Sequence, residues 1–533
     1  MNNIIDLFDS TLRDGSQGEG ISFSVEDKVK IVLALDTLGV KYIEAGNPGS
    51  NPKDLEFFQR TRDLKLKHAK LVSFGSTRRK NIAASEDANL ASLIASKTEI
   101  TSIFGKSWDF HVTDIIKTSL GENLQMIEDS VRFVCDSGSE VFYDAEHFFD
   151  GYLANPSYAM ETLKAALRGG ATTLVLCDTR GGTLSETVGS ITREVGELLP
   201  NIPLGIHTHD DIGCAVASSI AAVQAGAVQV QGTLLGFGER CGNACLFSVA
   251  GILSAKMGYD CLNGQSLEQL TGISRKVAEI SNVRIPHTAP FIGVSAFAHK
   301  GGMHIDGVGK SPSSFEHIDP TSVGNERRLL MSEVAGRALM LKRIHKVAPE
   351  LDKDNPLTIS LMEELKKLEA EGYQFEGAES SFDLVIRRHL KLYRPFFTLV
   401  HYQTIGSSPY LDPLSDASHA AVVKVKVKGE SAITAAEGEG PVNALDQALR
   451  KVLEQFYPTL KSVHLTDYKV RVLDTAGATA SKVRVLIDST DGESTWSTIG
   501  VSKDIIEASW LALSDSIEYK LIADGIVPSD DSN

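Results

Sequence analysis

The sequence predicts an α/β protein that begins with a (β/α)₈ barrel, continues into small helical subdomains and ends in an α+β domain. Up to about residue 260, short runs rich in β-branched and aromatic residues alternate with longer amphipathic stretches, the pattern of a parallel sheet with helical crossovers. Beyond residue 396, apolar and polar side chains alternate at period two, which indicates strands. The 533 residues also exceed what one core usually holds, so several domains are expected.

Eight strands can be counted in the first part of the chain. They are expected at residues 4–8, 41–44, 70–74, 100–104, 140–143, 172–177, 203–207 and 229–233. Helical patterns follow them, as at residues 24–39, where Ser24 is a capping residue, Asp27 lies in the first turn and Gly39 ends the helix. Eight such units fit a closed barrel in both rhythm and length. An open doubly wound sheet is the alternative, but no second glycine-rich dinucleotide turn supports it.

The rest of the chain changes character twice. Residues 1–265 are expected to form the barrel, 266–395 helical linker subdomains, 396–525 an α+β domain and 526–533 a frayed tail. In the linker, residues 299–310 are glycine-rich and predict a loop, 333–346 an amphipathic helix and 357–373 a solvated helix. In the last domain, residues 420–429, 462–474 and 481–490 predict strands of one sheet with helices on one face.

Composition excludes several classes of protein. The formal charge of -16 argues against a general affinity for nucleic acid or anionic membrane. The six cysteines show no CxxC pair, so reduced thiols are expected. The first residues lack the basic and then apolar order of a signal peptide, and no apolar run reaches the roughly 18 residues of a membrane span. A cytoplasmic protein is therefore expected.

Residues with catalytic or ligand chemistry follow several of the predicted strands. In a (β/α)₈ barrel the active site lies at the carboxyl ends of the strands. Arg13 and Asp14 follow the first strand, Glu146 the fifth and Thr179 the sixth, while His207 and His209 end the seventh. The sequence therefore predicts a site that combines charged, hydroxyl and imidazole groups at the barrel mouth.

His207 and His209 are two residues apart, so both side chains project to the same side of an extended strand. Two neutral imidazoles and the Asp14 carboxylate, with coordination positions left open, suit a first-row divalent ion that acts as a Lewis acid. Zinc, manganese and magnesium all remain possible, and the nitrogen ligands favour the first two. An isolated HxH is as often structural, but this one ends a strand opposite an independently placed Asp14.

A glycine-rich turn follows the eighth strand in GTLLGFGERCGNA. Its glycines Gly236, Gly238 and Gly242 let backbone amides approach a ligand, although many bare turns share this spacing. The turn also carries Glu239, Arg240 and Asn243, and the Asn243 side chain can supply an oxygen ligand to the metal.

A second group of polar residues lies on the glycine-rich segment 299–310. It contains His299, His304 and Asp306. A loop of this kind can close over a barrel mouth, where His304 would act as a general acid or base. The alternative is that His304 is a solvated loop histidine.

Four motifs occur in the order DSTLRDGSQ, IHTHDDIG, GFGERCGN and HKGGMHIDG. Together they resemble the metal-dependent Claisen-condensing synthases that include 2-isopropylmalate, homocitrate and citramalate synthases, and the resemblance covers nearly the whole chain. The citramalate synthase branch is most similar, on the stretches FDSTLRDGSQGEGISFS, EAGNPGSNPKD, VFYDAEHFFDGY and STWSTIGVSKDIIEASW. The resemblance implies condensation of acetyl-CoA with pyruvate.

The resemblance also implies residue roles. It makes Asp14, His207 and His209 the metal ligands, with Asn243 in or near the coordination sphere, and it makes Arg13 and Thr179 the groups that hold the 2-oxo acid. The turn at residues 236–242 corresponds to the acyl-CoA loop.

Glu146 and His304 correspond to the acid/base pair that acts on the acetyl methyl group. One position departs from the family, because related synthases often have a tyrosine where this chain has Phe315. A phenyl ring cannot relay a proton, so His317 or a water would have to fill that role. The last domain is implied to bind an end-product amino acid, here isoleucine, as a feedback inhibitor and to form a homodimer.

Four other functions are compatible with parts of the pattern. The same reaction can use a larger acceptor, 2-oxoisovalerate or 2-oxoglutarate. An acyl-CoA lyase or oxo-acid aldolase would run the reverse chemistry, but has no obvious need of the last domain. A carrier-dependent carboxyltransferase would need a lysine at a strand end, and none ends the predicted strands five to eight. A non-catalytic metabolite sensor is the fourth.

Overall fold

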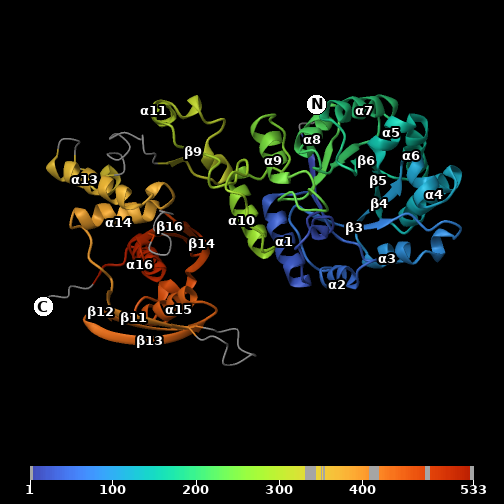
Figure 1. The fold of residues 1–533 in the computed structure, drawn as a ribbon. Helices are drawn as coiled ribbons and strands as arrows, with labels where there is room; N and C mark the ends of the chain where they lie inside the picture. The colour runs from blue at the N-terminus through green and yellow to red at the C-terminus, as the bar shows by residue number, and fades with distance from the viewer. Residues whose placement is uncertain are drawn as a thin grey trace. The chain divides into compact units, whose positions relative to one another are not determined.

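The computed structural model describes residues 4–330, 344–349, 351, 355–406, 419–473 and 481–528. The chain divides into two compact units (Figure 1). The first comprises Met1–Ala298 and Ser311–Arg328, and the second comprises His299–Lys310 and Leu329–Asn533. The predicted domain boundaries remain predictions.

The first unit contains a closed barrel of eight parallel strands in sequence order, so the predicted (β/α)₈ barrel is confirmed. Its strands are β1 (Asp6–Asp9), β2 (Tyr42–Gly46), β3 (Lys70–Ser76), β4 (Ile100–Lys106), β5 (Glu140–Glu146), β6 (Thr173–Asp178), β7 (Leu204–Thr208) and β8 (Gln229–Gly232). Each matches a predicted strand, and pairing of β1 with β8 closes the ring.

Ten α-helices accompany the barrel in this unit (Figure 1). They are α1 (Val25–Leu38), α2 (Pro52–Arg60), α3 (Ala88–Ser96), α4 (Leu120–Asp136), α5 (Phe148–Ala154), α6 (Pro156–Gly169), α7 (Ser185–Leu198), α8 (Ala215–Gln224), α9 (Leu246–Ala255) and α10 (Leu270–Ile280). α1 starts with the predicted capping box between Ser24 and Asp27. It ends at Gly39, where φ is 93° and a Cβ would lie 2.1 Å from the carbonyl oxygen of Leu262, so only glycine fits.

The barrel interior is apolar at one level and polar at another. A small cluster of fully buried side chains comprises Phe8, Val72, Ile100 and Phe142. Two residues further along their strands, Ser102 and Asp144 are also fully or almost fully buried. Because side chains alternate along a strand, this spacing places polar groups on the inner face beside the mouth.

Residues 302–310 form a helix, α11 (Gly302–Lys310), and not the predicted loop. Three glycines lie in these nine residues, and glycine disfavours a helix interior, so local propensity pointed to a loop. Ile305 packs against a hydrophobic cluster of the second unit, which gives the helix tertiary support that propensity does not register.

Two further helices in this unit are α13 (Pro356–Glu371) and α14 (Glu379–His389). The helix predicted at residues 357–373 is therefore present, although it buries Leu361 and Leu365 against the same cluster. The helix predicted at 333–346 lies largely outside the described residues.

The last part of the chain contains two three-stranded antiparallel sheets, so the expectation of one sheet was wrong. The first comprises β11 (Thr398–Gly406), β12 (His419–Val427) and β13 (Glu430–Gly438), with α15 (Pro441–Leu453) after it. The second comprises β14 (His464–Val472), β15 (Val483–Thr490) and β16 (Thr495–Ser502), followed by α16 (Ile505–Ala523). One core joins their apolar side chains, which explains why two similar sequence patterns looked like a single sheet.

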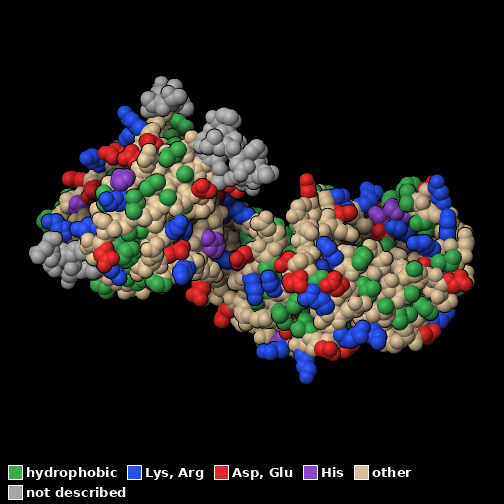
Figure 2. Space-filling model, turned by 90° about the horizontal axis from the view of Figure 1, so that it is seen from below, with side chains coloured by type: hydrophobic (Ala, Val, Ile, Leu, Met, Phe, Trp, Pro, Cys, Tyr) green, Lys and Arg blue, Asp and Glu red, His purple; other side chains and the backbone are tan. Residues whose placement is uncertain are grey.

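Acidic and basic side chains are interspersed on the face of the molecule seen in Figure 2. No helix in the described part of the chain is both long enough and apolar enough to cross a membrane.

Candidate metal centre and active-site pocket

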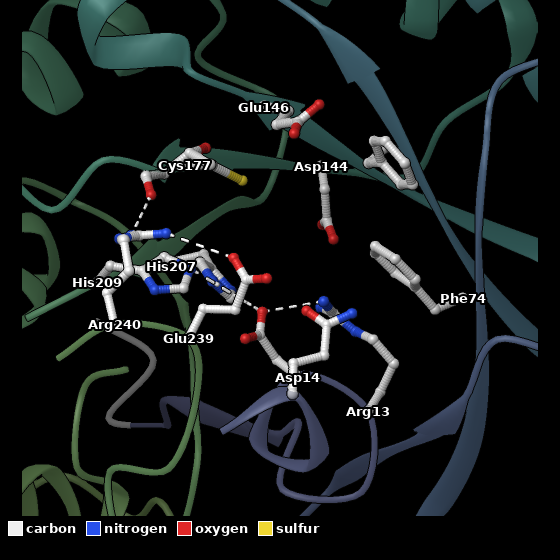
Figure 3. A pocket seen from close by; sticks show the side chains of 13 residues that line it. Arg13, Asp14, Phe74, Asp144, Glu146, Cys177, His207, His209, Glu239 and Arg240 are labelled. Atoms are coloured by element: carbon white, nitrogen blue, oxygen red, sulfur yellow. Dashed lines mark hydrogen bonds and ion pairs between the residues drawn. The ribbon is translucent and has the colours of Figure 1, made fainter. Parts of the chain in front are cut away.

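An open pocket lies at the carboxyl ends of the barrel strands (Figure 3). Eight residues that the sequence predicted for the site line it: Arg13, Asp14, Glu146, Thr179, His207, His209, Glu239 and Arg240. Five others complete the lining: Gln17, Phe74, Phe104, Asp144 and Cys177. The pocket therefore gathers side chains from both ends of the barrel sequence.

Asp14, His207 and His209 converge in this pocket (Figure 3). Asp14 Oδ2 lies 3.7 Å from His207 Nε2 and 4.0 Å from His209 Nε2. All three residues are buried. First-row ions bind nitrogen and oxygen at about 2.0–2.2 Å, so one cation can bridge atoms at these separations. The donor set and its spacing fit a divalent metal ion.

The electrostatics of the three residues favour the forms that bind metal. Burial alone would raise the pKa of Asp14, but the Arg13 guanidinium and the two imidazoles outweigh it and hold this pKa below its ordinary value. Burial, together with repulsion from His207, lowers the pKa of His209 to about 4. At neutral pH the site thus contains a carboxylate and a neutral His209 imidazole, whose nitrogen lone pair is available.

Two acids and an aromatic ring fix the orientation of Arg13. Its Nε donates to Glu44 Oε2 at 2.6 Å, and its Nη1 donates to Asp14 Oδ2 at 2.9 Å. The guanidinium carbon lies 3.7 Å from the centroid of the Phe74 ring. Because these contacts hold the guanidinium in place, its remaining N–H groups point in a fixed direction. Such an arrangement suits recognition of an anionic oxygen.

Asn243 connects the glycine-rich turn to the proposed metal ligands. Its Nδ2 donates to Asp14 Oδ1 and to the Phe237 carbonyl oxygen, both at 3.0 Å. Its Oδ1 is buried and has no hydrogen-bond partner among the described residues. Asn243 therefore contacts Asp14 directly and keeps a buried acceptor beside the centre.

The turn itself requires glycine. Gly236, Gly238 and Gly242 all have positive φ. A Cβ at Gly238 would lie 2.2 Å from Asn243 Nδ2, and one at Gly242 would lie 2.0 Å from the Gly236 carbonyl oxygen. Side chains at these positions would displace Asn243 or open the turn.

Arg240 ties the turn to neighbouring strand ends. Its Nε donates to Asp211 Oδ1 at 2.8 Å, and its Nη2 donates to the Thr179 carbonyl oxygen at 2.8 Å. Arg240 therefore links the turn after β8 to the segments that follow β6 and β7.

Glu146 and Thr179 lie on the side of the pocket formed by β5 and β6. Glu146 forms an ion pair with Lys106, the last residue of β4. Thr179 Oγ1 accepts a hydrogen bond of 2.8 Å from the backbone N–H of His147. His147 has a positive φ of 59°, a strained conformation that points this N–H at Thr179.

Sequence reasoning missed eight residues of the site and its surroundings: Gln17, Glu44, Phe74, Phe104, Lys106, Asp144, Cys177 and Gln231. Glu44, Asp144 and Gln231 are polar residues inside strands and are at most 4% exposed. The sequence did offer a signal for them. A charged or amide side chain at an inward-facing position of a barrel strand indicates a polar group inside the barrel. Burial, with help from the nearby Glu44 carboxylate, raises the pKa of Asp144 above its ordinary value.

His304 belongs to the second unit, on α11, and is exposed there. Its predicted role as acid or base therefore stays a prediction. Phe315 and His317 belong to the first unit, and the His317 ring packs near the rings of Phe291 and Phe297, at centroid distances of 5.4 and 6.0 Å. Replacement of the family's tyrosine by His317 likewise stays a prediction.

Comparisons with known proteins agree with this architecture. A family model described as HMGL-like matches residues 4–277, a homocitrate synthase post-HMGL domain-like model matches 291–372, and a LeuA allosteric (dimerisation) domain model matches 376–521. The (R)-citramalate synthase of Geobacter sulfurreducens is 50% identical over 97% of this chain and 98% of that protein. The (R)-citramalate synthase of Aquifex aeolicus is 49% identical over the same shares. The 2-isopropylmalate synthase of Yersinia pestis is 30% identical over 96% and 95%.

Proposed function

The chain belongs to the HMGL-like family and, within it, to the (R)-citramalate synthases, and on this premise we propose that its barrel condenses acetyl-CoA with pyruvate to give (R)-citramalate and CoA. The full-length similarity to five citramalate synthases, at 44–50% identity, supports pyruvate over the larger acceptor of 2-isopropylmalate synthases, whose identity is near 30%. The same similarity makes the chain a transferase and argues against a sensor without turnover.

The convergence of Asp14, His207 and His209 is the observation that carries the proposal. These residues would hold a divalent cation, with Asn243 beside them, and manganese, zinc and magnesium all fit a donor set of nitrogen and oxygen. When bound, the cation supplies Lewis acidity that polarises the ketone of the 2-oxo acid.

Arg13 and Thr179 orient the acceptor in the proposed site. Arg13 offers a guanidinium edge to an oxygen of pyruvate, and it stabilises the negative charge that develops when the ketone becomes an alkoxide. Thr179 lines the same pocket, with its hydroxyl positioned by the backbone N–H of His147.

Glu146 and His304 are the proposed acid/base residues. One proton leaves the acetyl methyl group, and the resulting carbanion attacks the keto carbon of pyruvate, so that a C–C bond forms and the ketone oxygen takes up a proton. Water then cleaves the thioester and releases CoA and the 2-hydroxy diacid. The turn at Gly236, Gly238, Glu239, Arg240, Gly242 and Asn243 is the proposed acetyl-CoA-binding segment.

Turnover of three acceptors tests the proposed reaction. We expect kcat/KM with acetyl-CoA to be highest for pyruvate, lower for 2-oxoisovalerate and lowest for 2-oxoglutarate, with citramalate as the product identified by mass spectrometry. A higher kcat/KM for either larger acid would contradict the assignment to citramalate synthesis.

The last domain is the proposed site of dimer formation and feedback control. The match to a LeuA allosteric (dimerisation) domain supports both roles. Isoleucine is the proposed inhibitor, because citramalate would serve isoleucine biosynthesis in the cytoplasm. Initial rates should fall as isoleucine is added but not as valine is added, and light scattering should give twice the chain mass. Kinetics that do not respond to isoleucine would remove this part of the proposal.

A further inference from the structure

Gln231 lies beside His207 in the barrel wall. The two residues pair directly across β7 and β8, so their side chains emerge on the same inner face. Gln231 is fully buried, and its Oε1 lies 3.0 Å from His207 Nδ1. The other ring nitrogen, Nε2, faces Asp14. One edge of the imidazole therefore meets the candidate metal centre, and the other meets a buried amide.

Two acceptor oxygens fix the orientation of the Gln231 side-chain amide. Gln231 Nε2 lies 3.2 Å from Asp144 Oδ1 and 3.4 Å from Gln229 Oε1. The second Asp144 oxygen accepts a hydrogen bond of 2.8 Å from the Ser102 hydroxyl, which anchors the carboxyl group. Because the NH₂ group of Gln231 faces these oxygens, its carbonyl oxygen must face His207.

A carbonyl oxygen can only accept, so His207 has to donate from Nδ1. We propose that Gln231, held by Asp144, is a positioning residue that fixes His207 as the Nδ1–H tautomer and turns its Nε2 lone pair toward Asp14. This inference rests on the proposed metal role of Asp14, His207 and His209. In the opposite tautomer, a proton on Nε2 would occupy the direction in which the cation binds.

His209 provides an internal contrast. Its Nδ1 is buried but has no hydrogen-bond partner among the described residues. Both histidines present Nε2 to Asp14, but only His207 has a hydrogen-bond partner at Nδ1 among the described residues. We therefore expect the buried Gln231 amide to act on the candidate metal centre through His207 and not through His209.

Metal affinity of the metal-depleted full-length protein tests the inference without relying on turnover. Zn²⁺ is titrated against a chromogenic chelator for the wild type, for Gln231→Leu and for the double variant Asp144→Asn/Gln231→Glu. Gln231→Leu removes the acceptor, and loss of an outer partner of a metal-binding histidine weakens binding by about 10–100-fold. In the double variant, the glutamate accepts from His207 and the asparagine donates to the glutamate, so affinity should return to the wild-type value.

Ser73→Ala is the matched control, since Ser73 is a buried barrel residue whose hydroxyl forms hydrogen bonds with Thr98 and Thr101 and not with His207. It should bind Zn²⁺ like the wild type. Unchanged affinity in Gln231→Leu, or equal weakening in the double variant, would overturn the inference and leave the proposed function standing. A wild type that binds no divalent ion would overturn the metal centre itself.

If Gln231→Leu does not fold, the wild type decides the question. Nitrogen shifts of ¹⁵N-histidine-labelled, metal-depleted protein, assigned by comparison with His207→Ala, should show a protonated Nδ1 and an unprotonated Nε2 for His207. The reverse pattern would contradict the inference.

Discussion

Among the single residues of the pocket, two aromatic rings stand beside the charged groups. Phe74 and Phe104 both line the pocket and stack with centroids 5.1 Å apart and an interplanar angle of 14°. Phe74 also supports the Arg13 guanidinium, so Phe104 is the ring that can be trimmed without releasing Arg13. The pair is therefore the feature of the pocket that we test for an effect on acceptor size.

Phe104→Leu should widen the acceptor range. An added methylene in an apolar pocket changes kcat/KM by about 10-fold or more, so the ratio of kcat/KM for 2-oxobutanoate over pyruvate should rise by about that factor. Steady-state kinetics with both acids measure the ratio. Phe57→Leu is the control, since Phe57 is fully buried in α2 and does not line the pocket, and it should leave the ratio unchanged. An unaltered ratio in Phe104→Leu would mean that other groups set acceptor size.

The sequence predicted the centre of the site better than its surroundings. Asp14, His207 and His209 could be found because strand order and strand ends are visible in the pattern, and a barrel brings those ends together. Asp144 and Gln231 could not be assigned, because alternation tells which face a side chain occupies but not which atom it meets across the barrel.

Among the elements around the candidate metal centre, the glycine-rich turn after β8 is tightly packed. Gly238→Ala would bring a Cβ to 2.2 Å from Asn243 Nδ2 and 3.3 Å from Asp14 Oδ1. Because Asn243 has to move, kcat/KM should fall by at least about 10-fold, within the range for disturbed outer partners of metal ligands. Steady-state rates of CoA release provide the measurement.

Gly213→Ala is the control that distinguishes the effect of contact with Asn243 from the effect of backbone strain. Gly213 also has positive φ, at 71°, but a Cβ there would meet no atom within 4 Å. It should cost stability by about 1–2 kcal/mol and leave kcat/KM near the wild-type value. Equal kinetic losses in the two variants would show that contact with Asn243 is not the cause.

The sequence predicted some helices and strands better than others. All eight barrel strands were predicted, because buried parallel strands between amphipathic helices leave a strong pattern. α11 was missed because its glycines favour a loop and its support comes from packing against distant residues such as Ile344. The sequence predicted one sheet where the structure has two after residue 396. Alternation of apolar and polar residues identifies a strand but does not show which strand it pairs with.

At the scale of the whole molecule, stability should depend on pH through a buried acid in the second unit. Glu518 on α16 is 2% exposed, and its carboxyl oxygens lie 3.1 and 3.3 Å from the backbone N–H of Phe396. Burial raises the pKa of Glu518 to about 7. A raised carboxyl pKa contributes stability that is complete below the unfolded pKa and is lost as pH rises through the folded one.

The unfolding free energy of this unit should therefore fall between about pH 4.3 and pH 7, by at most about 1.4 kcal/mol per pH unit from this group. Glu518→Gln should remove that component, so its Tm should approach the wild-type value at pH 5 and exceed it at pH 7.5. Glu430→Gln, at an exposed position on β13, serves as the control. A Tm difference between wild type and Glu518→Gln that does not vary with pH would contradict the assignment.

In the proposed reaction, a cation held by Asp14, His207 and His209 makes the condensation possible. Release of CoA thiol from acetyl-CoA and pyruvate, followed in metal-depleted protein while Mn²⁺ is returned, tests it most directly. We expect a negligible rate without metal, recovery that saturates at one ion per chain, and no recovery in His207→Ala despite an unchanged circular dichroism spectrum. A full rate in the metal-depleted protein, or in His207→Ala, would contradict it.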